Sequence, residues 1–119
     1  MHVRLLMTFT FEAAHFLPSF PDGHKCRRMH GHSFRVDVVV SGDVPEGQHY
    51  LIDYGELAET VEPVRLRLDH HLLNEIEGLE HPTSEMLAGW IWDRIKPDVP
   101  MLEEIRVHET CLASCEYRG

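Results

Sequence analysis

The sequence predicts an α+β domain in which two helices pack on one face of an antiparallel sheet. Three observations lead to this fold class. The chain opens with two segments that alternate apolar and polar residues, continues with two segments of helical periodicity, and closes with a further alternating segment. This order needs few crossovers, which favours antiparallel pairing. A length of 119 residues fits one domain, residues 1–119.

Composition and charge restrict the classes of function. Apolar residues make up 43% of the chain, enough for one core, and the net charge of −9 argues against general nucleic-acid binding, which needs a basic face. The chain contains no run of about 18 apolar residues, so no membrane span is predicted. The N-terminus does not show the charged region, apolar region and cleavage site of a signal peptide. Three irregularly spaced cysteines do not form a disulfide framework. We therefore expect a cytoplasmic protein, and its small size favours oligomerisation.

The two opening segments predict two strands, the first ending in a histidine and the second preceded by two histidines. His15 shares the parity of the apolar positions before it, so it points to the core side if the strand has no bulge. His30 and His32 share the parity of the apolar positions after them. Residues 17–23 between the strands are rich in Pro and Gly and predict a loop. The alternating apolar residues are Val3, Leu5, Met7, Phe9 and Phe11 in the first strand, and Phe34, Val36, Val38 and Val40 in the second.

The first helix is predicted to begin after Asp53, which has the pattern of an N-cap with Glu56 at the third helical position. Its apolar positions recur with spacings of three and four. Pro63 lies inside this pattern, so we expect a kink or short break there. The apolar positions are Leu57, Val61, Val64 and Leu68.

The second helix is predicted to open at residues 82–85 (Pro-Thr-Ser-Glu) and to end at Lys96-Pro97. Its apolar face carries Leu87, Trp90, Ile91 and Ile95. A last strand is expected from Glu104 to Leu112. One side of this strand carries Ile105, Val107, Glu109 and Cys111. We expect a further short strand near Tyr50 or Leu72.

Three histidines form a candidate metal site. His30 and His32 are two residues apart, so both point to one face of a strand, and Gly31 between them leaves room for close approach. Such a pair can also be ordinary polar surface, but His15 on a matching face favours a metal. Three neutral imidazoles with an open fourth position describe a catalytic zinc site, which polarises substrate oxygens or activates water.

A cysteine lies beside three cations in the stretch that precedes His30. Lys25, Arg27 and Arg28 flank Cys26 and would favour its thiolate form, which acts as a base. Cys26 could instead be a fourth zinc ligand or a small buried residue, and the cations could be a solvated turn.

Two further positions suggest acid–base or binding chemistry. Asp69 next to His70 can set the charge and orientation of an imidazole that transfers protons, although His71 could serve instead. Glu109 lies on the apolar side of its strand, where an unpaired carboxylate is costly. Either an internal arginine pairs with it, or a ligand with two neighbouring N–H donors does, such as the edge of a pterin or guanine.

Five motifs, in order and suitably spaced, resemble those of the 6-pyruvoyl-tetrahydropterin synthase family, and within it the 6-carboxytetrahydropterin synthase branch of queuosine biosynthesis. The resemblance covers nearly the whole chain. The motifs are Phe-Glu-Ala-Ala-His ending at His15, His-Lys-Cys-x-x-x-His-Gly-His at 24–32, Leu-Asp-His-His-x-Leu-Asn at 68–74, Pro-Thr-Ser-Glu at 82–85 and Glu-Thr-Cys at 109–111.

The resemblance implies the tunnelling fold (T-fold), an antiparallel sheet with two helices on one face. It implies that subunits join edge to edge into a barrel-like trimer, that two trimers stack into a homohexamer, and that the active site lies between subunits. The matching residues are the zinc ligands His15, His30 and His32, the catalytic base Cys26, the proton relay of Asp69 and His70, the pterin anchor Glu109, which also joins this catalytic relay, and Thr83, Ser84 and Glu85 near the pterin pocket.

The implied reaction converts 7,8-dihydroneopterin triphosphate to 6-carboxy-5,6,7,8-tetrahydropterin, acetaldehyde and triphosphate, with one Zn²⁺ per subunit. We expect the cations Lys25, Arg27 and Arg28 to pair with the triphosphate charge, although the protein as a whole is acidic. Two alternatives stay open: a 6-pyruvoyl-tetrahydropterin synthase, which keeps the carbon side chain, and a zinc-dependent pterin-binding protein without turnover.

Overall fold

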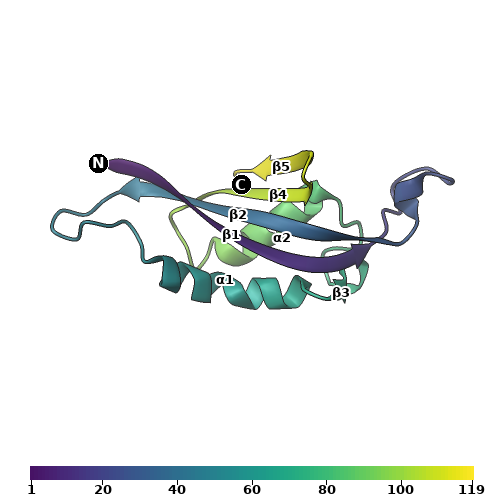
Figure 1. The fold of residues 1–119 in the computed structure, drawn as a ribbon, viewed down its shortest axis with the longest axis horizontal. Helices are drawn as coiled ribbons and strands as arrows, with labels where there is room; N and C mark the ends of the chain where they lie inside the picture. Colours follow the sequence, from purple (N-terminus) through teal and green to yellow (C-terminus); the bar gives the residue numbers. More distant parts are fainter.

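The computed structural model describes residues 1–119 as a five-stranded sheet with two α-helices and two short 3₁₀ turns. Both helices lie on one face of the sheet, and the long β1–β2 pair runs the length of the molecule (Figure 1). Neither α-helix is long and apolar enough to cross a membrane. The elements are β1 His2–His15, η1 Lys25–Arg27, β2 His30–Asp43, α1 Tyr54–Leu68, β3 His71–Leu72, η2 Leu73–Glu75, α2 Ser84–Ile95, β4 Leu102–Thr110 and β5 Ala113–Tyr117.

The sheet has the order β3-β1-β2-β4-β5. β1 and β2 pair antiparallel along their whole length, from His2 opposite Asp43 to His15 opposite His30. β3 confirms the short strand expected near Leu72, but it pairs parallel to β1, so the sheet is mixed rather than purely antiparallel. The cause is the connection through α1, which returns the chain to the β1 edge as a crossover.

The C-terminal strand prediction was wrong at its end. β4 stops at Thr110, and the chain turns and returns as β5, which pairs antiparallel with β4. The Thr110 hydroxyl accepts a hydrogen bond from the Leu112 backbone N–H (3.2 Å), a turn that hydroxyl residues support without Gly or Pro. Cys111 is consequently exposed in the turn and does not lie on the core side of a strand.

The helices confirm the predicted caps and faces. The Asp53 carboxylate accepts a hydrogen bond from the Glu56 N–H (3.1 Å), and all the predicted apolar positions of both helices are buried. The break expected at Pro63 does not occur, because α1 continues through it to Leu68. Pro63 lies on the exposed side of the helix, where water can replace the missing backbone hydrogen bond.

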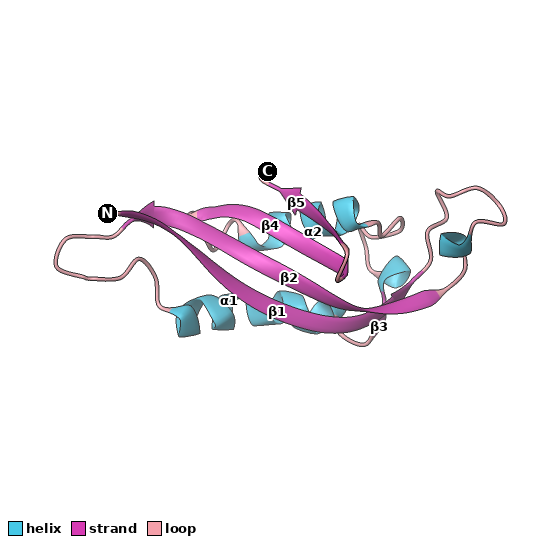
Figure 2. Cartoon of the chain, turned by 45° about the horizontal axis from the view of Figure 1, so that its top comes forward, coloured by secondary structure: helices cyan, strands magenta, loops and turns pink.

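The core lies between the helices and the inner face of the sheet (Figure 2). Phe11 and Phe34 stack across β1 and β2 with ring centroids 4.9 Å apart. Phe34 also meets the rings of His15 and His32 edge-on, with centroids 5.6 and 5.4 Å apart. The apolar face of the sheet therefore continues directly into the histidines, which lie at one end of the core.

The outer face of the sheet is polar. Glu104 is fully buried there, and one of its carboxylate oxygens accepts hydrogen bonds from Arg4 (3.0 Å) and Arg106 (3.1 Å). Asp37, which is also buried, accepts a hydrogen bond from the Thr8 hydroxyl (2.8 Å) and contacts the His108 ring (2.9 Å). These contacts link β1, β2 and β4 on the side that the helices leave uncovered.

Candidate metal centre and active site

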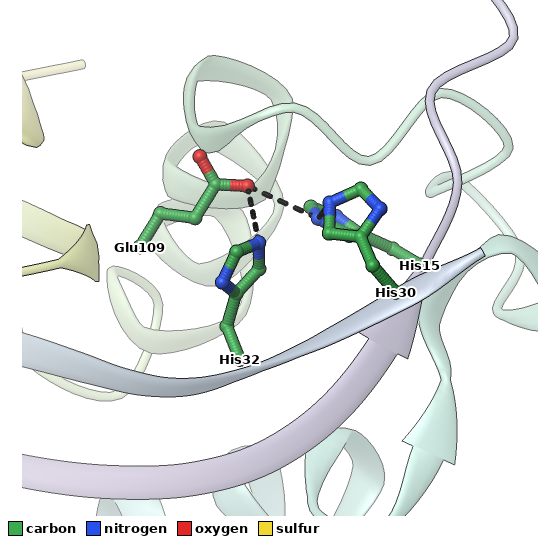
Figure 3. A group of neighbouring side chains, drawn as sticks. All are labelled: His15, His30, His32 and Glu109. Atoms are coloured by element: carbon green, nitrogen blue, oxygen red, sulfur yellow. Dashed lines mark hydrogen bonds and ion pairs between the residues drawn. The ribbon is translucent and has the colours of Figure 1, made fainter. Parts of the chain in front are cut away.

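Four side chains converge at the end of the core (Figure 3). His15 ends β1, His30 and His32 begin β2, and Glu109 lies near the end of β4. Their ligand atoms all lie within 4.8 Å of one another. The predicted parity explains this geometry, because the sheet register sets His30 opposite His15 and His32 opposite Ala13, the residue two before His15.

Backbone carbonyls fix two of the imidazoles. The Nδ1 atom of His15 lies 2.9 Å from the Pro82 carbonyl oxygen, and that of His30 lies 2.7 Å from the Arg28 carbonyl oxygen. A carbonyl only accepts, so each Nδ1 carries the proton and each neutral ring directs its Nε2 lone pair into the cluster.

The cluster fits a bound cation. The Nε2 atoms of His15 and His30 are 3.0 Å apart, and two lone pairs at that distance repel unless a cation lies between them. The Nε2 atom of His32 is buried without a hydrogen-bond partner. Burial lowers the pKa of His32, which keeps its ring neutral and able to act as a ligand. These residues fit a divalent metal ion bound by three imidazoles.

Glu109 completes the cluster. Its Oε1 atom lies 3.0 Å from His15 Nε2 and 3.4 Å from His32 Nε2. The structure answers the question that the sequence left open: the internal partners of Glu109 are histidines and not an arginine.

Cys26 opens onto the same site. It lines a pocket of about 390 Å³ together with Lys25, His30, His32, Glu109 and Thr110. Its backbone is fixed on both sides, because the Cys26 N–H donates to His24 Nδ1 (3.1 Å) and its carbonyl accepts from the Leu17 N–H (2.9 Å). A half-buried thiol held beside a metal site in a pocket can act as a base on a bound substrate.

The three cations of this stretch lie in different places within one chain. Lys25 lines the pocket, but the Arg27 guanidinium donates to the carbonyls of Pro18 (2.7 Å) and Phe20 (2.8 Å) and pairs with Asp22 (3.1 Å). Arg28 lines a separate recess on the outside of the loop. The 3₁₀ turn at residues 25–27 sends consecutive side chains in different directions, so only Lys25 reaches the pocket.

Asp69 and His70 form the predicted pair. Asp69 Oδ2 lies 3.0 Å from His70 Nδ1, and its Oδ1 accepts a hydrogen bond from the Glu12 N–H (2.9 Å). The hydrogen bonds from Glu12 and then from His70 lower the pKa of Asp69, so the carboxylate stays charged and orients the ring. His70 has a left-handed backbone (φ 58°), a conformation that costs energy for a residue other than glycine.

Within one chain, His70 and Cys26 line different pockets. The His70 side chain is 79% exposed and lies at a recess of about 550 Å³. His32 is the one residue that lines both this recess and the pocket of Cys26. The recess is lined by Glu12, Ala13, Ala14, Gly31, His32, Ser33, His70, His71 and Leu72.

The segment 82–85 contributes differently from the expectation. The Thr83 hydroxyl caps α2 by accepting from the Met86 N–H (3.3 Å), and Ser84 is the first residue of the helix. Glu85 lines a groove along α2 with Trp90, and the pocket of Cys26 contains none of these three residues. The contribution of the segment to the metal centre is the Pro82 carbonyl, a backbone role that residue types do not reveal.

Asn74 is a positioning residue that sequence reasoning missed. Its Oδ1 accepts from the Phe16 N–H (3.0 Å) and its Nδ2 donates to the Phe16 carbonyl (2.8 Å). This two-way clamp holds the chain where it leaves β1, directly after His15. The only signal in the sequence was its place at the end of the 68–74 motif.

Comparison with solved structures defines the fold. The chain superposes on the 6-pyruvoyl tetrahydropterin synthase of Caenorhabditis elegans with a TM-score of 0.91 at 24% identity, covering 100% of this chain and 96% of the other. The architecture is thus the tunnelling fold of pterin synthases.

Sequence comparison defines the family. The family model described as 6-pyruvoyl tetrahydropterin synthase matches residues 4–119, and the chain belongs to that family. A 6-carboxy-5,6,7,8-tetrahydropterin synthase of Synechocystis is 42% identical over 115 residues, covering 92% of this chain and 88% of the relative. A dihydroneopterin monophosphate aldolase of Pyrococcus furiosus is 35% identical over 100 residues, covering 84% and 81%.

Proposed function

We propose that this chain is a zinc-dependent 6-carboxy-5,6,7,8-tetrahydropterin synthase of queuosine biosynthesis. It converts 7,8-dihydroneopterin triphosphate and water to 6-carboxytetrahydropterin, acetaldehyde and triphosphate. The observation that carries the proposal is the single pocket in which Cys26 and Glu109 face the three-histidine cluster. The family and the identity to the Synechocystis enzyme support the same activity.

The residues of the pocket divide the chemistry among them. Zinc held by the three histidines supplies Lewis acidity to the hydroxyl groups of the substrate side chain. Cys26, as a thiolate, takes a proton from the side-chain carbon next to the pterin ring or from a hydroxyl. Glu109 accepts two neighbouring N–H groups of the pterin, which fixes the ring. Lys25, in the same pocket, pairs with the triphosphate.

The relay of Asp69 and His70 completes the site from a neighbouring subunit. In one chain these residues lie outside the pocket of Cys26. The sheet has edges to pair: β3 covers β1 only at Ala13 and Ala14, and β5 is paired on one side only. We therefore propose trimers joined edge to edge, two of which form a homohexamer, with His70 of one subunit facing Cys26 of the next.

The first experiment follows consumption of 7,8-dihydroneopterin triphosphate by the purified protein, before and after removal of its metal. We expect turnover that ends with chelation and returns with zinc. A protein that binds pterin and zinc but consumes no substrate would instead be a binding protein, and the proposal would be wrong.

A second candidate comes from the Pyrococcus relative, which is named for an aldolase acting on a monophosphate. An aldolase breaks the bond between the first two side-chain carbons and leaves a hydroxymethyl pterin. Parallel assays with dihydroneopterin monophosphate and triphosphate distinguish the two, since the proposed enzyme forms triphosphate and a carboxylated pterin.

A further inference from the structure

Glu109 has two competing roles, because it is the proposed pterin anchor and also contacts the histidine cluster. Pairing with a pterin needs both carboxylate oxygens directed into the pocket, yet Oε1 lies among the histidine nitrogens. We propose that Glu109 is a displaceable fourth ligand of the metal, bound in the free protein and released to the pterin when substrate enters. The second half of this inference rests on the proposed function.

The tautomers show what Glu109 faces. The His15 ring donates its Nδ1 proton to Pro82, so its Nε2 carries a lone pair and not a proton. A carboxylate oxygen 3.0 Å from that lone pair is repelled unless both bind one cation. Glu109 Oε1 is close to two ring nitrogens at once, as a fourth ligand of a tetrahedral site would be.

Glu109 is also the ligand that is free to leave. His15 and His30 are each held by a backbone carbonyl outside the cluster, whereas Glu109 contacts only the histidines. It lies where the register between β4 and β5 shifts, from His108 to Thr110, and its side chain is 25% exposed towards the pocket. Rotation about its side-chain bonds can therefore carry the carboxylate from the metal to the pocket without moving the strand.

We call this movement of the Glu109 carboxylate from the metal to the pterin the exchange. It couples substrate binding to activation of the metal. A site with four protein ligands is closed, whereas a catalytic zinc needs an open position. When the pterin edge takes both oxygens of Glu109, the fourth position opens beside the bound substrate, ready for its side-chain hydroxyls. In the free protein the closed site leaves no position for water, which limits side reactions.

Cobalt substitution tests the ligand role without reference to turnover. The visible absorption of Co²⁺ bound to the full-length protein reports its coordination. We expect Glu109→Gln to change the cobalt spectrum and to weaken zinc binding at least tenfold, since a charged ligand is lost. The matched control Glu59→Gln, on the exposed side of α1, should change neither. An unchanged spectrum and zinc affinity in Glu109→Gln would overturn the ligand assignment.

Unsubstituted pterin, which has the N–H edge but no side chain, tests the exchange. Adding unsubstituted pterin to the cobalt protein should shift the wild-type spectrum towards that of the Glu109→Gln variant without pterin. The spectrum of the variant itself should change little when pterin is added. Pterin binding to the wild type with no spectral change would overturn the exchange. If pterin does not bind at all, the proposed function and the exchange both fail, while the variant spectrum still decides whether Glu109 is a ligand.

Discussion

At the metal centre, some residues are held rigidly as metal ligands and others keep a free side chain for the reaction. Two histidines are fixed by carbonyls of Pro82 and Arg28, while Cys26 is fixed only through its backbone. The Cys26 thiol is thus free to react without disturbing the metal ligands. A base can be removed from such a site while binding is preserved.

Cys26→Ala should reduce turnover by about 10²- to 10⁴-fold, the usual contribution of a positioned base. Zinc content and pterin affinity should stay within about twofold of the wild type, because the thiol is not needed for the cluster. Steady-state kinetics, metal analysis and a pterin titration check this. Near-normal turnover would remove Cys26 from the mechanism.

Lys25 and Arg27, two positions apart, should behave differently. Lys25→Gln should raise KM for the triphosphate substrate several-fold, because this cation faces the pocket. Arg27→Gln should leave KM near normal and lower the free energy of unfolding by about 1 kcal/mol, because it loses hydrogen bonds to exposed backbone carbonyls. Equal KM changes in the two variants would contradict this assignment.

At the scale of elements, the strands and helices near the core could be predicted from the sequence. Periodicity located the buried faces of both helices, and strand parity brought His15, His30 and His32 to one side. Features set by loops could not be predicted. β5 begins after a turn that lacks Gly and Pro, and the clamp by Arg27 depends on the path of residues 18–22.

The candidate site shows the same division. Side chains on regular strands were placed correctly, including Glu109 on the core side of β4. The carbonyl of Pro82 and the amide of Asn74 were missed, because their roles depend on two distant segments meeting. Sequence spacing also cannot show that His70 and Cys26 line separate pockets in one chain.

On the scale of the whole molecule, the polar outer face ties the strands together through buried charge. Glu104 is fully buried between Arg4 and Arg106. Burial by itself raises the pKa of Glu104, but the hydrogen bond from Arg106 and the other contacts outweigh it and hold the pKa below its ordinary 4.5. Its charge therefore stabilises the fold above the ordinary pKa, and this contribution is lost as pH falls through the lower folded value.

Glu104→Gln should consequently lower the free energy of unfolding at pH 7 by about 2 kcal/mol, because the hydrogen bonds from Arg4 and Arg106 lose their buried carboxylate acceptor. The difference between wild type and variant should shrink as the pH is lowered below 4.5, when the wild-type carboxyl becomes protonated too. Urea denaturation across this range measures it. A difference that stays constant with pH would show that Glu104 does not act through its charge.

Assembly can be tested by complementation between subunits. If Cys26 and His70 meet across an interface, Cys26→Ala and His70→Ala subunits refolded together should regain activity. At equal amounts about a quarter of the sites should be intact, because each site draws its two residues from different subunits. Each variant alone should show only its low residual activity, and a mixture with no recovery above that level would place both residues in one subunit.

The products of the reaction distinguish a 6-carboxytetrahydropterin synthase from a 6-pyruvoyl-tetrahydropterin synthase. Zinc-loaded protein would be incubated with 7,8-dihydroneopterin triphosphate, and the products analysed by mass spectrometry. We expect acetaldehyde together with 6-carboxytetrahydropterin. A 6-pyruvoyl pterin without acetaldehyde would contradict it and assign the same pocket to the sister reaction, in which the carbon side chain stays intact.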